Sequence, residues 1–124
     1  MKPILNLTIR RKWLDMIASG EKREEYRAIN TRGSRNWQRR IHDAILADDF
    51  ATAIFRAGYR LDSPAVLVEI ADAVSAPARS EFHPEWGEPL YAPHWVIYIS
   101  QVLDRGPYDY IRRLAGYGMN GRAK

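Results

Sequence analysis

The chain of 124 residues contains no cysteine. This absence excludes a disulfide framework, a thiolate zinc site and a cysteine nucleophile, and it favours a cytoplasmic protein. Long apolar runs are absent too. The N-terminal MKPILNLTIRRKW has too short a run for a signal peptide, and no later segment reaches the roughly 20 apolar residues that span a membrane. We therefore expect a cytoplasmic protein that makes no contact with a membrane.

A glycine-rich phosphate loop between a strand and a helix is also missing. The one Gly-x-Gly-x-x-Gly, GYGMNG at residues 116–121, begins at the end of the last predicted helix and follows no strand. The sequence also has no Walker loop and no regular alternation of strands and helices, which disfavours a doubly wound nucleotide-binding sheet. The length suits one domain, which we assign to residues 1–116, with a flexible tail over residues 117–124. We expect no cofactor, and a monomer is the favoured state.

Basic residues are concentrated in the first half of the chain. Residues 1–60 carry 13 Lys and Arg against 7 Asp and Glu, a net +6, whereas residues 61–124 carry 6 against 8, a net −2. Arginine accounts for 15 of the 19 basic side chains, and its planar fork suits phosphates and base edges. This asymmetry is compatible with a polyanionic partner such as RNA, or with the net charge that any small soluble protein needs.

Hydrophobic periodicity predicts a mixed α/β chain. Alternation predicts a strand over residues 5–9, and a broad apolar face predicts a helix over residues 11–19 that ends at Gly20. Arginines at helical spacing predict a second helix over residues 33–46. A further strand is predicted at residues 51–60, where a helix is the alternative. Another is predicted at 66–74, with Val66 and Val74 on one face. A third is predicted at 94–103 and is expected to be buried on both sides. A last helix is predicted at residues 107–116. We expect the strands to form a small curled sheet or barrel of the α+β class.

The stretch GEKREEYR, residues 20–27, is charged at six of its eight positions and follows the first predicted helix. In a regular strand Lys22 and Glu24 point to one side, and Glu25 and Arg27 point to the other, unless a bulge near Gly20 shifts the start of the strand. Because neither side is apolar, the strand lines a wet cleft or forms a charged edge that deters aggregation. The residues alone leave both alternatives open.

The segment WLDMIASGEKREEYR leads from a helix into Gly-x-Lys-x-x-Glu-x-Arg, and in this it resembles the ASCH domain family, relatives of the PUA-like RNA-binding barrels. The resemblance extends more loosely to FRAGY at residues 55–59, to the strand at 66–74 and to HWVIYIS, so that it covers most of residues 4–103. It implies a small PUA-like β-barrel of about five to six strands with two to three flanking helices, and a cleft that faces RNA or a nucleoside.

The resemblance also implies a function. Family members act as RNA-binding modules, and some are hydrolases: amidohydrolases that deacetylate N-acetylated cytidine, or ribonucleases. The motif lysine falls on Lys22, the acidic position on Glu25 and the arginine on Arg27, whereas the amidohydrolase branch has threonine at the position of Glu25. Binding of RNA or a nucleoside is our first expectation. A hydrolase on the same fold is the alternative, so enzymatic activity stays open.

Chemical roles follow from residue type. A buried Lys22 has a lowered pKa and suits proton transfer, and a charged Lys22 suits stabilisation of an oxyanion. Glu25 suits a charge-assisted bond to Lys22 or Arg27. The predicted catalytic residues are Lys22, Glu25 and Glu85, and the predicted ligand-binding residues are Arg27, Tyr26, Trp86, Arg32, Arg35 and Arg39.

The proline-rich loop over residues 75–93 supplies Glu85 and Trp86 to this list. His83-x-Glu85 resembles the start of a zinc-deaminase signature, but the paired cysteines that complete it are absent. Histidines and glutamates of such a loop more often serve turns and hydrogen bonds, so we expect no metal site. Trp86 suits stacking on a base, and Glu85 suits an acid or base in the cleft.

The arginines just before and within the second predicted helix should contribute affinity without sequence preference. Replacing Arg32, Arg35 and Arg39 with glutamine should weaken binding to single-stranded RNA, because phosphate contacts are lost. The dependence of log K on log salt should also become flatter, since each lost contact lowers the magnitude of the slope by about 0.7. Fluorescence titrations at several salt concentrations measure this slope. An unchanged slope in the triple variant would assign these arginines to ordinary solvated surface.

Overall fold

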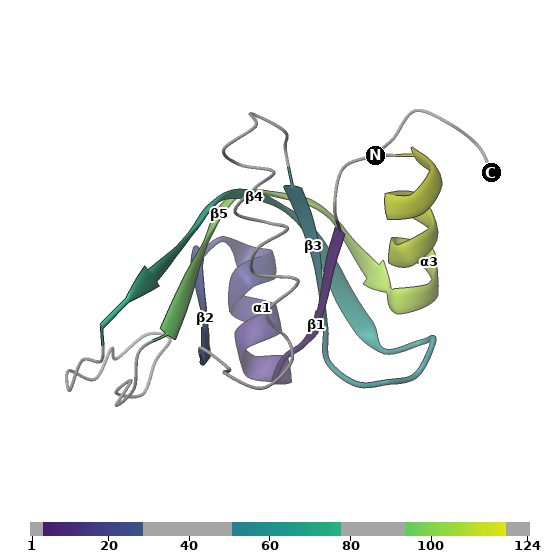
Figure 1. The fold of residues 1–124 in the computed structure, drawn as a ribbon. Helices are drawn as coiled ribbons and strands as arrows, with labels where there is room; N and C mark the ends of the chain where they lie inside the picture. The colour runs from purple at the N-terminus through teal and green to yellow at the C-terminus, as the bar shows by residue number, and fades with distance from the viewer. Residues whose placement is uncertain (1–3, 29–50, 78–93, 119–124) are drawn as a thin grey trace.

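The computed structural model describes residues 4–28, 51–77 and 94–118 (Figure 1). The helix predicted at 33–46, nearly all of the loop at 75–93 and the end of the tail, 119–124, lie outside the described residues. In the described part, no helix has the length and apolar character that crossing a membrane requires. The elements are β1 (Ile4–Thr8), α1 (Arg11–Ser19), β2 (Glu24–Ala28), β3 (Ala51–Arg56), β4 (Pro64–Ala76), β5 (His94–Pro107) and α3 (Tyr108–Arg113), which a π-helical turn, Leu114–Gly118, continues.

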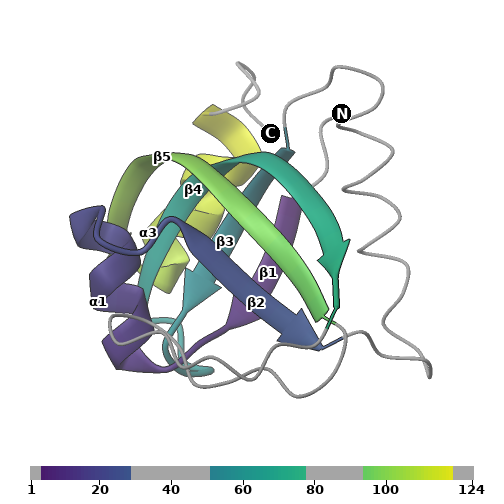
Figure 2. The same ribbon diagram turned by 90° about the vertical axis from the view of Figure 1, so that its left-hand side faces the viewer.

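The five strands form one mixed sheet in the order β1-β3-β4-β5-β2. β1 pairs with β3 in parallel, and the other three pairings are antiparallel. The sheet curls into a half-barrel, so that β1 and β2 lie at its two edges (Figure 2). The expected α+β class with a small curled sheet is therefore confirmed.

The two helices cover opposite faces of this sheet (Figure 1). On the inner face Leu14 and Ile17 of α1 pack with Phe55, Val66 and Val68. On the outer face Ile111 of α3 packs with Ile54 and Leu67. Neighbouring residues of β3 and β4 alternate between the two clusters, as the two-residue period of a strand requires. These central strands are therefore buried on both faces.

Most predicted elements occur close to their expected positions. The helix over residues 11–19 is confirmed, and Gly20 follows it with φ 88°, the left-handed conformation that glycine adopts without a steric penalty. The ambiguous segment at 51–60 contains strand β3. The charged strand, however, begins at Glu24 and not at residue 20, so the chain enters it through a short irregular stretch.

Two predictions about burial are wrong. Val74 does not share a face with Val66, because β4 has an irregularity between Ile70 and Asp72 that shifts the register by one residue and brings Ala73 into the inner core. The strand at 94–103 is not buried on both sides throughout, because Tyr98 of β5 is 37% exposed.

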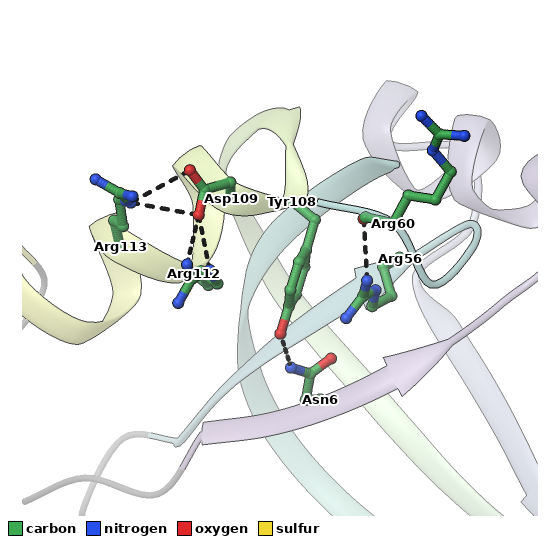
Figure 3. A network of polar contacts seen from close by, with 7 residues as sticks. All are labelled: Asn6, Arg56, Arg60, Tyr108, Asp109, Arg112 and Arg113. Carbon is green, nitrogen blue, oxygen red and sulfur yellow. Dashed lines mark hydrogen bonds and ion pairs between the residues drawn. The ribbon is translucent and has the colours of Figure 1, made fainter. Parts of the chain in front are cut away.

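An arginine and a tyrosine hold the β3–β4 turn against α3 (Figure 3). The guanidinium of Arg56 lies 3.4 Å from the ring centroid of Tyr108 and donates hydrogen bonds to the carbonyl oxygens of Gly58 and Arg60, at 2.8 and 3.0 Å. The Tyr108 hydroxyl in turn accepts a hydrogen bond from Asn6 Nδ2 of β1, at 2.6 Å. This arginine is therefore engaged in joining the turn, α3 and β1.

Replacing Arg56 with lysine should destabilise the protein by about 1–2 kcal/mol, because lysine keeps the charge but loses the planar stacking and one of the two hydrogen bonds. Urea unfolding measures the difference. The matched control is Arg60→Lys, since the Arg60 side chain is 84% exposed and pairs with Asp62 at the surface, where such pairs contribute little. Equal losses in the two variants would contradict this role of Arg56.

Candidate functional site

The charged motif lies where the chain passes from α1 into the edge strand β2. After Gly20 the backbone turns back, and the amide of Lys22 donates a hydrogen bond to the carbonyl oxygen of Met16 in the last turn of α1, at 3.0 Å. The carbonyl oxygen of Arg23 accepts from Ile99 of β5, at 2.9 Å. Because successive carbonyls of a strand point in opposite directions, that of Glu24 points away from β5, toward the free edge of the sheet.

Lys22 is a buried cation at this edge. The residue is only 2% exposed. Its Nζ lies 3.3 Å from Glu25 Oε1 and donates a hydrogen bond to the carbonyl oxygen of Glu24. The amine therefore satisfies an outward-pointing carbonyl of the edge strand while it pairs with a carboxylate.

Glu25 is shared between two cations and is itself 6% exposed. Its second oxygen, Oε2, lies 3.0 Å from Nε of Arg27, although this nitrogen does not point its hydrogen at the carboxylate with hydrogen-bond geometry. Nη2 of Arg27 donates to the carbonyl oxygen of Thr8, at 2.6 Å. Since Thr8 ends β1 and Arg27 belongs to β2, this bond connects the two opposite edges of the half-barrel (Figure 2).

Aromatic rings surround the amine of Lys22. The ring centroids of Tyr26 and Trp13 lie 4.8 and 5.7 Å from Nζ, within the range of cation–π attraction. The Tyr26 ring also meets the ring of His94 edge-on at 5.8 Å, and its hydroxyl donates to Glu24 Oε1 at 2.9 Å. The cation is therefore enclosed by ring faces as well as by oxygen acceptors.

Burial lowers the pKa of Lys22 below its usual value of 10.5. Desolvation is the largest cause, because an ammonium ion loses its hydration in a buried position. The negative charge of Glu25 opposes this shift without cancelling it. Lys22 thus gives up its proton more readily than an ordinary lysine, and a carboxylate lies close to the amine.

A hollow of about 330 Å³ lies beside Lys22, between the last turn of α1 and β5; its lining includes Gly20, Lys22, Arg23 and Ser100. This volume falls at the lower end of the range of about 300–1,000 Å³ for small-molecule sites. Another hollow, of about 230 Å³, has a lining that combines apolar core residues with Arg11, Asp62 and Arg105, whose side chains are exposed. We place the candidate site at the first hollow, because a buried ionic network adjoins it.

The structure brings together four of the predicted site residues: Lys22, Glu25, Tyr26 and Arg27. The prediction that Lys22 and Glu25 project to opposite sides of a strand is wrong, because Lys22 precedes β2 and its side chain reaches back to the carboxylate. The remaining predicted residues lie outside the described part of the chain: Glu85, Trp86, Arg32, Arg35 and Arg39.

Sequence reasoning missed two groups of the network. The Thr8 carbonyl belongs to the backbone, so no side-chain pattern marks it. Trp13 lies in the predicted helix over residues 11–19, outside the charged stretch, yet its ring faces Lys22. A search for aromatics one helix upstream of a motif lysine would have found it.

Comparison of the chain with protein-family models, with curated proteins and with solved structures gave no match. In residues 4–28, 51–77 and 94–118, no group of His, Asp and Glu side chains is arranged to hold a metal ion.

The lowered pKa of Lys22 predicts a pH dependence of stability. Between that pKa and 10.5 the unfolded chain binds more protons at this position than the folded protein, so the free energy of unfolding should rise with pH in this window. The variant Lys22→Met should lose this rise. Urea unfolding at a series of pH values tests it, with Lys12→Met at an exposed position of α1 as the control. Parallel stability curves for wild type and Lys22→Met would contradict the prediction.

Proposed function

We propose that the protein binds RNA or a nucleoside at the charged site formed by Lys22, Glu25 and Arg27, and that the chain is an ASCH-type domain with a PUA-like barrel. The resemblance of Gly20-x-Lys22-x-x-Glu25-x-Arg27 to the family motif supports this proposal. The observation that carries it is the burial of an ionic network at the edge of a small sheet.

Buried charges have a cost that apolar residues avoid. Removing two ions from water costs several kcal/mol per ion, and their mutual attraction often does no more than offset this cost. Lys22 and Glu25 occupy positions where packed apolar side chains would serve stability as well. Perturbed pKa values combined with such pairs are typical of functional sites. We therefore ascribe the network to ligand binding.

Arg27 is the residue of the network best suited to contact a ligand. Its side chain remains 27% exposed. A guanidinium carries five N–H donors; within the described residues Nη2 donates to Thr8, and Nε faces Glu25. The remaining donors of a group whose orientation is already set can bind a phosphate or a base edge with little further ordering.

A basic first half of the chain supports an anionic ligand. The net charge of residues 1–60 is +6, and Arg32, Arg35 and Arg39 contribute to it. Under the proposal these arginines follow the phosphate backbone, and Tyr26 and Trp86 provide ring faces for bases. The cavity at Lys22 accommodates a single nucleoside-sized group.

A hydrolase is the second candidate, and the state of Lys22 favours it. An amine with a lowered pKa, 3.3 Å from a carboxylate, is able to exchange a proton during a reaction. With N-acylated cytidine or RNA as the substrate, Lys22 would transfer the proton or stabilise the developing negative charge, and Glu25 or Glu85 would act as the acid or base.

Binding and turnover are tested with the same set of variants. Wild type, Arg27→Met, Lys22→Met and the control Lys12→Met are titrated with a single-stranded RNA, with cytidine and with N-acetylcytidine, and products are followed by chromatography. Arg27→Met should weaken binding by about tenfold or more, because a hydrogen bond from a charged group contributes about 1.5–3 kcal/mol. If the protein is a hydrolase, Lys22→Met should lower turnover by orders of magnitude.

Circular dichroism confirms that each variant is folded before its affinity is compared. Absence of binding to all three probes would refute the proposed function. Binding without turnover would support the hypothesis of a binding module and would exclude hydrolysis of these substrates. Turnover that does not respond to Lys22→Met would refute the catalytic assignment of this lysine.

A further inference from the structure

The indole of Trp95 contains a buried hydrogen-bond donor that has no partner among the described residues. An indole nitrogen only donates hydrogen bonds. Buried polar atoms nearly always have a partner in folded proteins, so an exception calls for a specific explanation, such as a water, an ion or a functional role. A phenylalanine would fill the position of an apolar ring in the sheet without leaving this donor unpaired.

Trp95 lies directly opposite Arg27 in the pairing of β5 with β2. Residues opposite one another in an antiparallel pair point to the same face, with Cβ atoms about 5 Å apart. Nε of Arg27 is the other buried side-chain donor of the described residues that makes no hydrogen bond, although it lies 3.0 Å from Glu25 Oε2. Two incompletely satisfied N–H groups therefore lie on neighbouring side chains of one face.

We propose that Trp95 and Arg27 together bind one oxygen acceptor of the ligand. The inference rests on the proposed function, and it adds Trp95 as a ligand-binding residue. Both groups are donors and one is positively charged, so the ligand atom between them is an anionic phosphate oxygen or a nucleobase carbonyl oxygen. Glu25 Oε2 lies 3.0 Å from Arg27 Nε, and the bond to Thr8 restrains the guanidinium, so the arginine is oriented before the ligand arrives.

This arrangement also predicts selectivity. A ligand that presents an N–H group at this position would leave three donors facing one another without an acceptor, and binding sites reject such ligands strongly. An oxygen acceptor satisfies the indole and the guanidinium at the same time. Trp95 therefore acts in specificity, through a hydrogen bond, and differs in this from the stacking aromatics Tyr26 and Trp86.

The test follows the indole N–H signal of Trp95 by NMR in the ¹⁵N-labelled full chain. The sequence has four tryptophans, and the signal is assigned through bonds to the Trp95 backbone and by its loss in Trp95→Phe. Uridine 5′-monophosphate, uridine and ribose 5-phosphate are added separately. The first probe carries both kinds of acceptor, the second carries the base carbonyls alone and the third carries the phosphate alone.

We expect the Trp95 indole proton to move downfield with the monophosphate and with one of the two simpler probes, which identifies the acceptor. Trp95→Phe should weaken binding of that probe by about tenfold, the effect of one neutral hydrogen bond. The control Tyr98→Phe removes a hydroxyl from an exposed ring on the opposite face of β5 and should bind normally.

The outcomes separate this inference from the proposed function. Binding that leaves the indole signal and the affinity of Trp95→Phe unchanged would overturn the role of Trp95 and keep the proposed function. No response of any signal to the three probes, or to single-stranded RNA, would overturn both. If Trp95→Phe fails to fold, the titration of the wild-type indole signal still decides the question.

Discussion

The two oxygens of Glu25 each face a cation, and the rest of the site depends on this shared carboxylate. Lys22 and Arg27 carry the same charge, and without an anion between them they would repel one another in a poorly hydrated place. The carboxylate allows the lysine amine to stay buried against a backbone carbonyl of β2. It also orients the guanidinium that reaches Thr8. The same carboxylate therefore stabilises the buried lysine and orients the arginine that connects the two edges of the half-barrel.

The arginines of this protein serve different purposes according to what surrounds them. Arg56 stacks on Tyr108 and donates hydrogen bonds to two carbonyl oxygens of the β3–β4 turn, so its guanidinium serves to stabilise the fold. Arg27 makes fewer contacts among the described residues and stays 27% exposed. It lies opposite Trp95, whose indole donor has no partner in the part of the chain that the structure describes. A count of basic residues does not distinguish these cases. The contacts of each guanidinium do, and they direct the search for a ligand to the edge strand β2.

Much of the architecture could be predicted from periodicity, because burial on one face leaves a clear pattern. It predicts α1, the alternation of buried residues in β1 and the strands β4 and β5. The face of Val74 could not be predicted, because one extra residue near Asp72 inverts the alternation without a sequence signal. The charged stretch and the family resemblance select Lys22, Glu25 and Arg27 as candidate site residues, but the sequence does not give their geometry. A backbone turn after Gly20 brings Lys22 to Glu25, and the strand register places Trp95 opposite Arg27.

The strand order bears on how the chain folds while it is being synthesised. Residues 4–28 leave the ribosome before the other described segments, yet β1 pairs with β3 and β2 pairs with β5. The strand neighbour of β2 is not complete until Pro107 has been added. The apolar side chains of α1 therefore cannot pack until the strands of the sheet have been synthesised. Most of the long-range strand pairing forms late. Such topologies fold slowly, and their early segments are exposed to wrong contacts during translation.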